Sequence, residues 1–435
     1  MSMTSWYREA DRRTRRVFWT CWAGWAMDSA DGLLYQYMIP LLVAGLGITL
    51  KEAGVIASAN YFAAAIGGWV GGWLCDRYGR ARILQLTILW FSFFSFVSGF
   101  AQNFDQMLVA RILQGIGFGA EWAVGAVLLG ELVAPQHRGK ALGTVQSGAA
   151  IGSCFAALLA GPVAAAFPPD LGWRVAFWAG IAPAGLIFFV RRGSDDAEVF
   201  KQAKRRAAEK GRQAGILDIF APRMLRITLP AALLSVGVQG GAFAVANYTT
   251  SFLTLERGLT SSMAGICVLL LSAGGIAGIL TNAYISDRIG RRKVFRYYSL
   301  GFILTASFYL FMPLGSSLWT LIPAGMCYGF FQFGMYASFG PYFTELFPTE
   351  LRGSGQSFSY NFGRACGAFF IFSVAYISDS MVLSAAMAIM AIVGVLLGLV
   401  ATMLLPETAG RKLISLDEIG GPAGESPAAK TEAAR

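Results

Sequence analysis

The feature that most constrains this chain is a succession of apolar runs, each about 20 residues long, separated by short polar gaps. A run of that length forms a helix that spans the hydrocarbon core of a bilayer. Only 14% of the residues are charged, against roughly 25% in soluble domains. We therefore predict an all-α polytopic membrane protein with twelve transmembrane helices. The expected spans are 17–45, 52–73, 83–102, 105–133, 139–166, 173–190, 227–254, 261–285, 294–312, 317–345, 353–377 and 380–405.

The 35 lysine and arginine residues are distributed unequally over the gaps between these runs. Thirty fall on the side that holds the N-terminus, and only Lys51, Arg174 and Arg257 fall on the opposite side. The positive-inside rule then places both termini in the cytoplasm. The net charge of +10 thus indicates topology and not a nucleic-acid-binding surface. Because no targeting peptide precedes the first run, we expect a bacterial inner membrane.

The metal-binding residue types are scarce. His137 is the single histidine and stands in a polar loop, where we expect it to be solvated. The six cysteines are widely spaced in apolar stretches with no C-x-x-C pair, so we expect small buried side chains and not bridges or ligands. No metal site and no cofactor is predicted, and no nucleophile–base pattern of an enzyme is visible.

The chain consists of two related halves. The segment GGWLCDRYGRAR at 71–82 recurs as NAYISDRIGRRK at 282–293, and ELVAPQHRG at 131–139 recurs as ELFPTELRG at 345–353. The offsets are 211 and 214 residues, which indicates two pseudo-symmetric six-helix bundles with a site at their interface. The predicted organisation is a cytoplasmic segment at 1–16, a first bundle at 17–190, a cytoplasmic linker at 191–226, a second bundle at 227–405 and a cytoplasmic tail at 406–435.

These motifs resemble those of the major facilitator superfamily of secondary transporters. The pattern G-x-x-x-D-R-x-G-R after the second run and R-x-x-Q-G-x-G-x-G-x-E in the fourth carry the resemblance, although Ala283 stands where the second copy often has glycine. The resemblance implies alternating access by rocking of the two halves, with gating by charged loops. The matching residues are Gly72, Asp76, Arg77, Gly79 and Arg80, then Arg111, Gln114, Gly115, Gly117, Gly119 and Glu121, and the expected gating residues are Asp76, Arg77, Arg80, Asp287, Arg288, Arg291, Glu131, Arg138, Glu345 and Arg352.

The first span resembles a narrower group within that superfamily. Asp28-Ser29-Ala30-Asp31 is similar to the D-G-x-D motif of aromatic acid:proton and of sialate or lactate:proton symporters, with Ser29 in place of glycine. The run Asn361-Phe362-Gly363-Arg364 in the eleventh span is also similar to those carboxylate symporters. The resemblance implies a small organic acid as the substrate.

A few charges lie inside the predicted spans, where an ionised side chain costs several kcal/mol. Such charges need a partner or a function. Asp28, Asp31 and Glu121 are our candidates for proton coupling. A guanidinium can hold a carboxylate through two parallel hydrogen bonds, so arginines lead the predicted substrate site. Its candidates are Arg364, Arg111, Asn361, Tyr360, Gln332, Gln146 and Asn247.

The sequence predicts a proton-coupled symporter that imports a small organic acid anion such as an aromatic acid, a monocarboxylate, a dicarboxylate or a sialate. The expected partners are that acid, protons and the lipid bilayer, with a monomer as the working unit and the proton gradient as the energy source. Two alternatives stay open. A sugar or polyol symporter is suggested by Pro406-Glu407-Thr408, and a proton-antiport exporter by Gly161-Pro162 in the fifth span.

Overall fold

The computed structural model describes residues 5–164, 166–186, 200, 202, 205, 215–312 and 317–416, which form helices and no strand. After the short helix α1 (Ser5–Glu9), twelve helical rods follow. In the first half they are α2 (Arg12–Leu46), α3 (Leu50–Tyr78), α4 (Arg80–Ser98), α5 (Phe104–Leu132), α6 (Arg138–Val145) with α7 (Gly148–Leu158), and α8 (Pro169–Trp178) with the 3₁₀ segment Ala179–Leu186. In the second half they are α11 (Pro222–Ala246) with α12 (Thr249–Leu255), α13 (Ser261–Ile289), α14 (Arg291–Phe311), α15 (Leu318–Tyr336) with α16 (Phe339–Leu346), α17 (Arg352–Ser378) and α18 (Leu383–Leu404).

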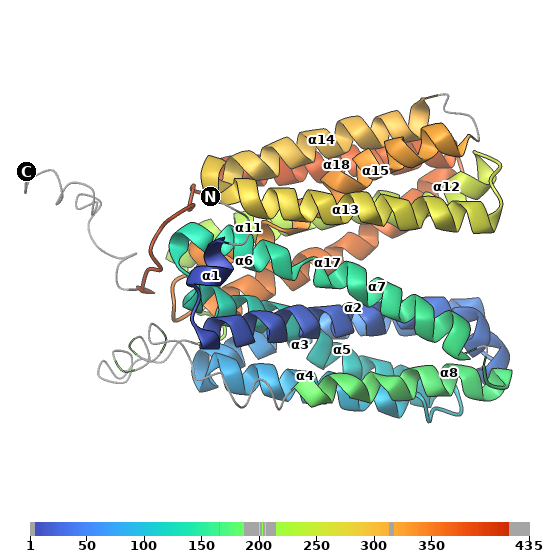
Figure 1. Cartoon of the computed structure of the whole chain (residues 1–435), viewed down its shortest axis with the longest axis horizontal. Coiled ribbons are helices and arrows are strands. Elements are labelled where there is room, and N and C mark those ends of the chain that lie inside the picture. The colour runs from blue at the N-terminus through green and yellow to red at the C-terminus, as the bar shows by residue number, and fades with distance from the viewer. Residues whose placement is uncertain are drawn as a thin grey trace, which may run out of the picture.

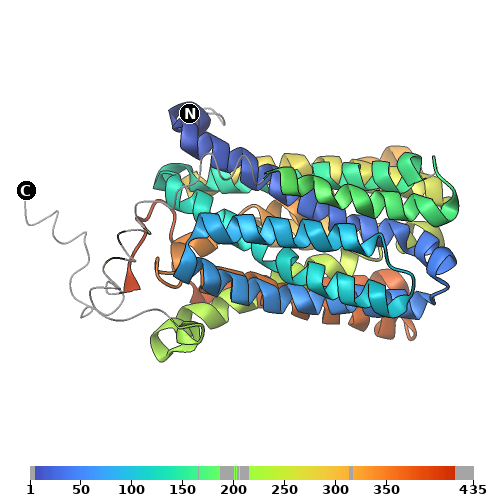
Figure 2. The same ribbon diagram turned by 90° about the horizontal axis from the view of Figure 1, so that it is seen from below.

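The rods lie roughly parallel in two bundles, one above the other in Figure 1, and Figure 2 shows the first bundle from below. The twelve predicted helices are confirmed, and each observed rod begins or ends within a few residues of its predicted span. Seven of the described helices are long and apolar enough by composition alone to cross a membrane. The others are broken or carry more polar residues.

Both bundles have one end in common, at which α2 begins and α18 ends; we call it the terminal end, and the opposite one the far end (Figure 1). α2 begins at Arg12, so its first two turns contain the arginines of 12–16 predicted to precede the first span. Asp11 caps this turn by accepting a hydrogen bond from the Thr14 amide at 2.7 Å. At the far end, Thr49 and Glu52 form a reciprocal capping box at the start of α3.

Two glycines explain why the motif of 71–82 recurs. Gly79 joins α3 to α4 with φ 111°, and Gly290 joins α13 to α14 with φ 101°. Residues that carry a side chain rarely adopt a positive φ, so only glycine makes these sharp reversals without strain. The repeated motif is therefore first of all a tight helix-to-helix turn, which holds the charged residues around it in place.

Three rods are interrupted near their middle. α6 and α7 are separated at Gln146 and Ser147, α11 and α12 at Asn247 and Tyr248, and α15 and α16 at 337–338. An interruption leaves backbone groups without their helical partners. Such breaks are tolerated inside a membrane only where protein or a cavity covers them. Protein covers the breaks at Gln146 and at 337–338, whereas Asn247 at the third break is exposed.

The halves contact each other through small residues at the terminal end. A methyl group added at Gly72 would overlap the Gly353 carbonyl, and one at Gly143 would overlap Ala283. The two helix pairs that make this contact, α3 with α17 and α6 with α13, are pseudo-equivalent. Glycine here allows the backbones of opposite halves to approach closely, as in other membrane helix pairs.

The structure differs from the sequence-based expectations at His137 and at two of the cysteines. His137 is buried, not solvated, and its Nε2 lies 3.0 Å from Glu9 of α1. All six cysteines are free, but Cys154 and Cys327 are exposed and so are not buried side chains as expected. Most of the predicted linker, and the tail beyond residue 416, lie outside the described residues.

Candidate functional site

Asp31 on α2 is held in a closed polar network. Its Oδ2 accepts hydrogen bonds from Arg111 Nη1 at 2.9 Å and from Gln114 Nε2 at 2.8 Å, and its Oδ1 accepts one from Ser95 Oγ. The side chains of Asp31 and Arg111 are 5% and 2% exposed. A buried ion pair offsets its desolvation only when further hydrogen bonds satisfy its polar atoms. Ser95 and Gln114 supply them to the carboxylate of Asp31, whereas Nε of Arg111 has no hydrogen-bond partner.

The network extends to α3 through Asn60. Its Nδ2 donates to the Gln114 Oε1 and to the Arg111 carbonyl, each at 2.6 Å. The Arg111 guanidinium also lies over the Tyr35 ring, 5.0 Å from its centroid. The charge of Arg111 is thus matched inside the first half, so the structure places this predicted substrate ligand away from the interface of the halves.

Asp28, one turn before Asp31, lies in a different environment. It is fully buried, and neither carboxylate oxygen has a hydrogen-bond partner. The charges of Glu121, Arg364 and Asp31 act on it. Glu121 on α5 is 1% exposed, and its Oε2 also lacks a partner. Its other oxygen lies against Gly24 of α2, where any side chain would collide with it.

Arg364 on α17 contributes the opposite charge from the second half. Its guanidinium carbon lies 4.8 Å from the centroid of the Phe118 ring on α5 and 5.2 Å from that of Tyr360. Within the described part of the chain no carboxylate forms an ion pair with it. The structure thus brings Asp28, Glu121 and Arg364 together at the interface of the halves, with a cation and two carboxyls that have no direct partner.

The other predicted site residues divide by location. Gln146 and Asn361 bridge the halves: Gln146 Nε2 donates to the Tyr336 carbonyl at 3.0 Å, and Asn361 Nδ2 donates to the Gly119 carbonyl at 2.9 Å. Gln332 is buried and its Oε1 has no partner. Asn247 is exposed and bonds only its own helix. Their roles stay predictions.

Sequence reasoning missed Phe118 and Trp122, which flank Glu121 on α5. The Trp122 ring stacks on that of Tyr360 with centroids 3.8 Å apart. The signal available was position alone: Trp122 directly follows Glu121, and Phe118 precedes it by one helical turn.

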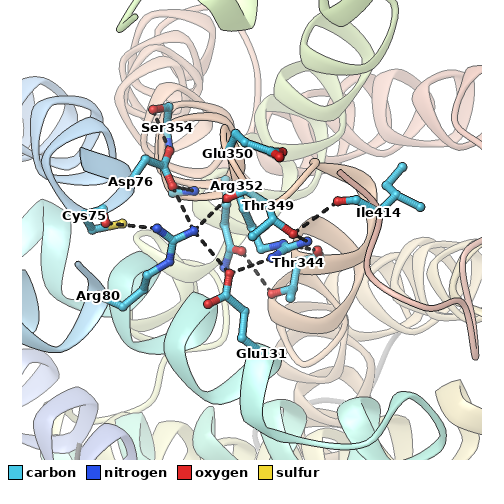
Figure 3. Close-up of polar contacts among 12 residues, drawn as sticks. Cys75, Asp76, Arg80, Glu131, Thr344, Thr349, Glu350, Arg352, Ser354 and Ile414 are labelled. Atoms are coloured by element: carbon cyan, nitrogen blue, oxygen red, sulfur yellow. Dashed lines mark hydrogen bonds and ion pairs between the residues drawn. The ribbon is translucent and has the colours of Figure 1, made fainter. Parts of the chain in front are cut away.

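The gating residues form two clusters at the terminal end, and the first is shown in Figure 3. Arg80 lies 3.2 Å from both Asp76 and Glu131, all in the first half. Arg352 from the second half lies 2.6 Å from Glu131. We call Asp76, Arg80, Glu131 and Arg352 the first latch, since its ion pair between Glu131 and Arg352 joins the two halves.

The first latch also uses the start of a helix. The two carboxylate oxygens of Asp76 accept hydrogen bonds from the backbone amides of Gly353 at 2.9 Å and Ser354 at 2.7 Å, in the first turn of α17. These amides have no partner within the helix, and the helix dipole favours a negative charge there. Arg80 donates to the Thr349 carbonyl at 2.7 Å, which adds a further bond between the halves.

The pseudo-equivalent cluster, the second latch, consists of Asp287, Arg291, Glu345 and Arg138. Arg291 lies 2.9 Å from Asp287 and 3.0 Å from Glu345. Asp287 accepts from the amides of Gly139 and Lys140 at the start of α6, at 2.8 and 2.9 Å. Arg138 lies 3.8 Å from Glu345.

Two predicted gating residues lie outside both latches. Arg77 and Arg288 are exposed, and each stacks on an aromatic ring of its own helix, Arg288 at 4.3 Å from the Tyr284 centroid. In the described residues neither takes part in an ion pair. The motif thus places one arginine in the interface and turns its neighbour outward.

Two repeated six-helix halves, with unmatched charges between them and, among the described residues, ion-pair latches at one end, are typical of a membrane carrier. The chain belongs to the Major Facilitator Superfamily, which residues 20–371 match. It is a multi-pass membrane transporter and not an enzyme.

Individual relatives agree. The chain is 39% identical over 428 residues to a probable 4-methylmuconolactone transporter of Cupriavidus pinatubonensis, covering 98% of each chain. It is 31% identical to the cis,cis-muconate transport protein of Acinetobacter baylyi, over 78% of this chain and 81% of that one. In fold it is similar to the proton:xylose symporter XylE, with a TM-score of 0.76 at 16% identity, over 94% of this chain and 99% of that chain.

Proposed function

We propose that this transporter carries a small organic acid anion into the cell together with a proton. The substrate class follows from the relatives, whose names give a muconolactone and a muconate. Both are small acids with at least one carboxylate. The observation that carries the proposal is Arg364, a guanidinium at the interface of the halves with no ion-pair partner among the described residues.

Arg364 is suited to a carboxylate in two respects. A guanidinium binds a carboxylate through two parallel charge-assisted bonds, and the edges of this one are not taken up by an acidic side chain of the described residues. Its flanking rings, Phe118 and Tyr360, offer apolar surface for the body of the substrate. A sugar carries no charge, so its binding would not require the guanidinium of Arg364 at the interface.

Proton coupling is assigned to Asp28, with Glu121 beside it. Both carboxyls are buried and both have oxygens without hydrogen-bond partners. An ionised carboxylate in such a place is costly without a compensating charge, so Asp28 takes up a proton when the charge of Arg364 no longer acts on it. When a substrate anion binds Arg364, Asp28 loses the benefit of that charge and binds a proton. Asp31 is excluded from this role because Arg111 already pairs with it.

This scheme makes the transport of a monoanion with one proton electroneutral. The pH gradient alone then drives it, with about 1.4 kcal/mol or tenfold accumulation per pH unit. We place the terminal end in the cytoplasm because it carries the basic excess. The conformation with both latches formed is then the one closed to the cytoplasm. A bacterial inner membrane and a monomeric working unit complete the proposal, with no cofactor besides the proton gradient.

The test is uptake into proteoliposomes under an imposed inward pH gradient, with 4-methylmuconolactone, cis,cis-muconate, benzoate, lactate, sialic acid and xylose. We expect uptake of at least one acid that a protonophore abolishes and that Arg364→Gln reduces at least tenfold. Arg15→Gln is the matched control, because Arg15 lies over the Tyr7 ring and belongs to no predicted site. Xylose uptake that survives Arg364→Gln would refute the anion site and favour a sugar symporter. Proton efflux driven by an apolar cation would favour an exporter.

A further inference from the structure

A pair of stacked aromatic rings joins the two halves between Arg364 and the terminal end. Trp122 of α5 and Tyr360 of α17 lie with ring centroids 3.8 Å apart and planes inclined by 25°. They are 5% and 3% exposed. Because one ring comes from each half, the halves cannot separate at the terminal end without breaking this stack. We call Trp122 and Tyr360 the inner gate.

The inner gate lies between the proposed anion site and the latches. Tyr360 precedes Arg364 by one turn of α17, on the side of the helix start at Arg352. Trp122 likewise follows Glu121 along α5 in the direction of Glu131. A substrate that leaves Arg364 toward the terminal end has to pass the level of these rings.

The Trp122 ring is fixed by a chain of hydrogen bonds that also crosses the interface. Its Nε1 donates to Gln146 Oε1 at 3.2 Å, and Gln146 Nε2 donates to the Tyr336 carbonyl at 3.0 Å. Gln146 lies at the break between α6 and α7, and Tyr336 ends α15 directly before its break. The stack is thereby tied to two of the three interrupted rods.

Arg364 contacts one ring of this pair, that of Tyr360. Its guanidinium carbon lies 5.2 Å from the Tyr360 centroid, within the range of a cation–π contact. A cation on Tyr360 withdraws electron density from that ring, which favours its stacking on an electron-rich indole. The cation, the phenol ring and the indole therefore form one electrostatic unit that spans the interface.

We propose that the inner gate senses whether Arg364 is occupied. A substrate carboxylate that pairs with Arg364 neutralises the cation and turns the guanidinium edge toward itself, which removes the cation from the Tyr360 ring and weakens the Trp122–Tyr360 stack. Substrate binding thus lowers the cost of opening the terminal end. Arg364 acts on opening through Tyr360, and Trp122 is a positioning residue that does not bind the substrate. This inference rests on the proposed anion site.

The chain contains its own reporter for opening. Cys75 on α3 is fully buried, and its Sγ lies against Gly353 of α17, in the other half. A variant in which the other five cysteines are replaced by serine or alanine keeps only this thiol. Its rate of reaction with N-ethylmaleimide then measures how often the terminal end opens, and no substrate is required.

In the Cys75-only protein we expect Arg364→Gln, Trp122→Leu and Tyr360→Leu each to raise the labelling rate about fivefold, the factor for one buried cation–π or stacking contact. Tyr360→Phe keeps the ring and should leave the rate near that of the parent. Arg364→Gln combined with Trp122→Leu should label no faster than Trp122→Leu alone. Arg15→Gln is the matched control, since Arg15 lies over the Tyr7 ring at 5.1 Å outside the interface.

An unchanged rate in Arg364→Gln, or additive effects in the double variant, would overturn the inner gate. Because Trp122→Leu also removes a buried ring, elution as a single monodisperse species is required of every variant, and Tyr360→Phe decides whether the ring itself is what matters. The two proposals fail in distinguishable ways. Loss of acid uptake in Arg364→Gln with unchanged labelling refutes the gate only. Faster labelling in the variants of a protein that takes up no acid refutes the anion site and with it the sensing of substrate, and leaves only the structural link from Arg364 through Tyr360 to Trp122.

Discussion

The two latches have the same residue types at pseudo-equivalent positions, yet they differ in where their charges point. In the first latch, Glu131 pairs with Arg352 of the other half at 2.6 Å. In the second, the corresponding distance from Glu345 to Arg138 is 3.8 Å. Glu345 instead accepts two hydrogen bonds from Arg291 of its own half, at 3.1 and 3.0 Å, and one from Thr408 at 2.8 Å.

Arg80 and Arg291, which follow the two glycine turns, differ in the same way as the two glutamates. Arg80 donates across the interface to the Thr349 carbonyl at 2.7 Å, whereas Arg291 donates to Ser286 of its own half at 2.9 Å. The glutamate and the turn arginine therefore hold the halves together in the first latch, whereas those of the second latch mainly stabilise the end of the second half. The cap by Asp287 crosses the interface in the second latch as that by Asp76 does in the first. Sequence symmetry does not imply equal energetic roles.

The largest effect is expected from removing the central carboxylate of each latch. Glu131→Gln leaves Arg80 and Arg352 buried without their shared anion, at a cost of about 3 kcal/mol. Since that anion joins the halves, we expect the labelling rate of Cys75 to rise more than tenfold. Glu345→Gln should lower the melting temperature comparably but change the labelling rate much less. Equal labelling rates in the two variants would contradict the division between the latches.

Replacement of the crossing arginines by lysine should have the next largest effect. Arg352 donates from three nitrogens, to the Thr344 carbonyl at 2.8 Å, to Glu131 and to Thr349 Oγ1 at 3.1 Å. Lysine has no planar fork, so Arg352→Lys should cost about 1.5 kcal/mol. Arg138→Lys should open the terminal end less, because Arg138 lies 3.8 Å from Glu345 and has one close hydrogen bond to the other half, to the Arg411 carbonyl at 2.9 Å. Labelling of Cys75 checks the order, and its reversal would refute it.

The helix-capping aspartates should behave alike. Asp76 and Asp287 each accept two backbone amides at the start of a helix of the other half. Loss of the charge at such a position costs about 1 kcal/mol. Asp76→Asn and Asp287→Asn should thus raise the labelling rate by similar factors of about five. A large difference between them would show that the asymmetry of the latches extends to their helix caps.

The smallest expected effect on stability comes from Glu407, which lies beside Arg291 of the second latch. Its carboxylate accepts hydrogen bonds from the amides of Arg291 and Arg292 at 2.8 and 3.1 Å. Burial raises the pKa of Glu407, but its backbone donors outweigh burial, so the pKa is lowered below its ordinary value of 4.5. The stabilisation is complete above that ordinary value and is lost as the pH falls through the lowered pKa.

Glu407→Gln should therefore lower stability by about 0.5 kcal/mol at neutral pH and remove this part of the acid sensitivity. Thermal unfolding at pH 7 and pH 3.5 measures both quantities. Identical pH dependence in the variant and the parent would show that the carboxylate does not contribute through its charge.

Much of the fold is predictable from the sequence because its signals are strong and local. The apolar runs indicate the twelve rods, and the repeated D-R-x-G-R turn indicates both latches, since Gly79 and Gly290 need the same positive φ. The distances from Glu131 to Arg352 and from Glu345 to Arg138 depend on how the halves dock. An offset of 214 residues carries no information about docking.

The central site shows the same limit. Asp28 and Asp31 are three residues apart on one helix, and the sequence assigns both to proton coupling. They differ because Ser95, Arg111 and Gln114 from other helices surround Asp31 only. The sequence does not predict a role for Trp122, because a tryptophan in an apolar run is typical of any membrane helix. Its contact with Tyr360 depends on how the two halves dock.

The most direct test of the central claim compares two modes of transport in Asp28→Asn, with a substrate found by the uptake panel. We predict that this variant loses accumulation driven by the pH gradient and keeps the exchange of labelled for unlabelled substrate at equal pH. The binding site and the alternation of the halves then persist without the proton carrier. Accumulation by Asp28→Asn at the level of the parent protein would contradict the assignment of Asp28, and with it the proposed coupling.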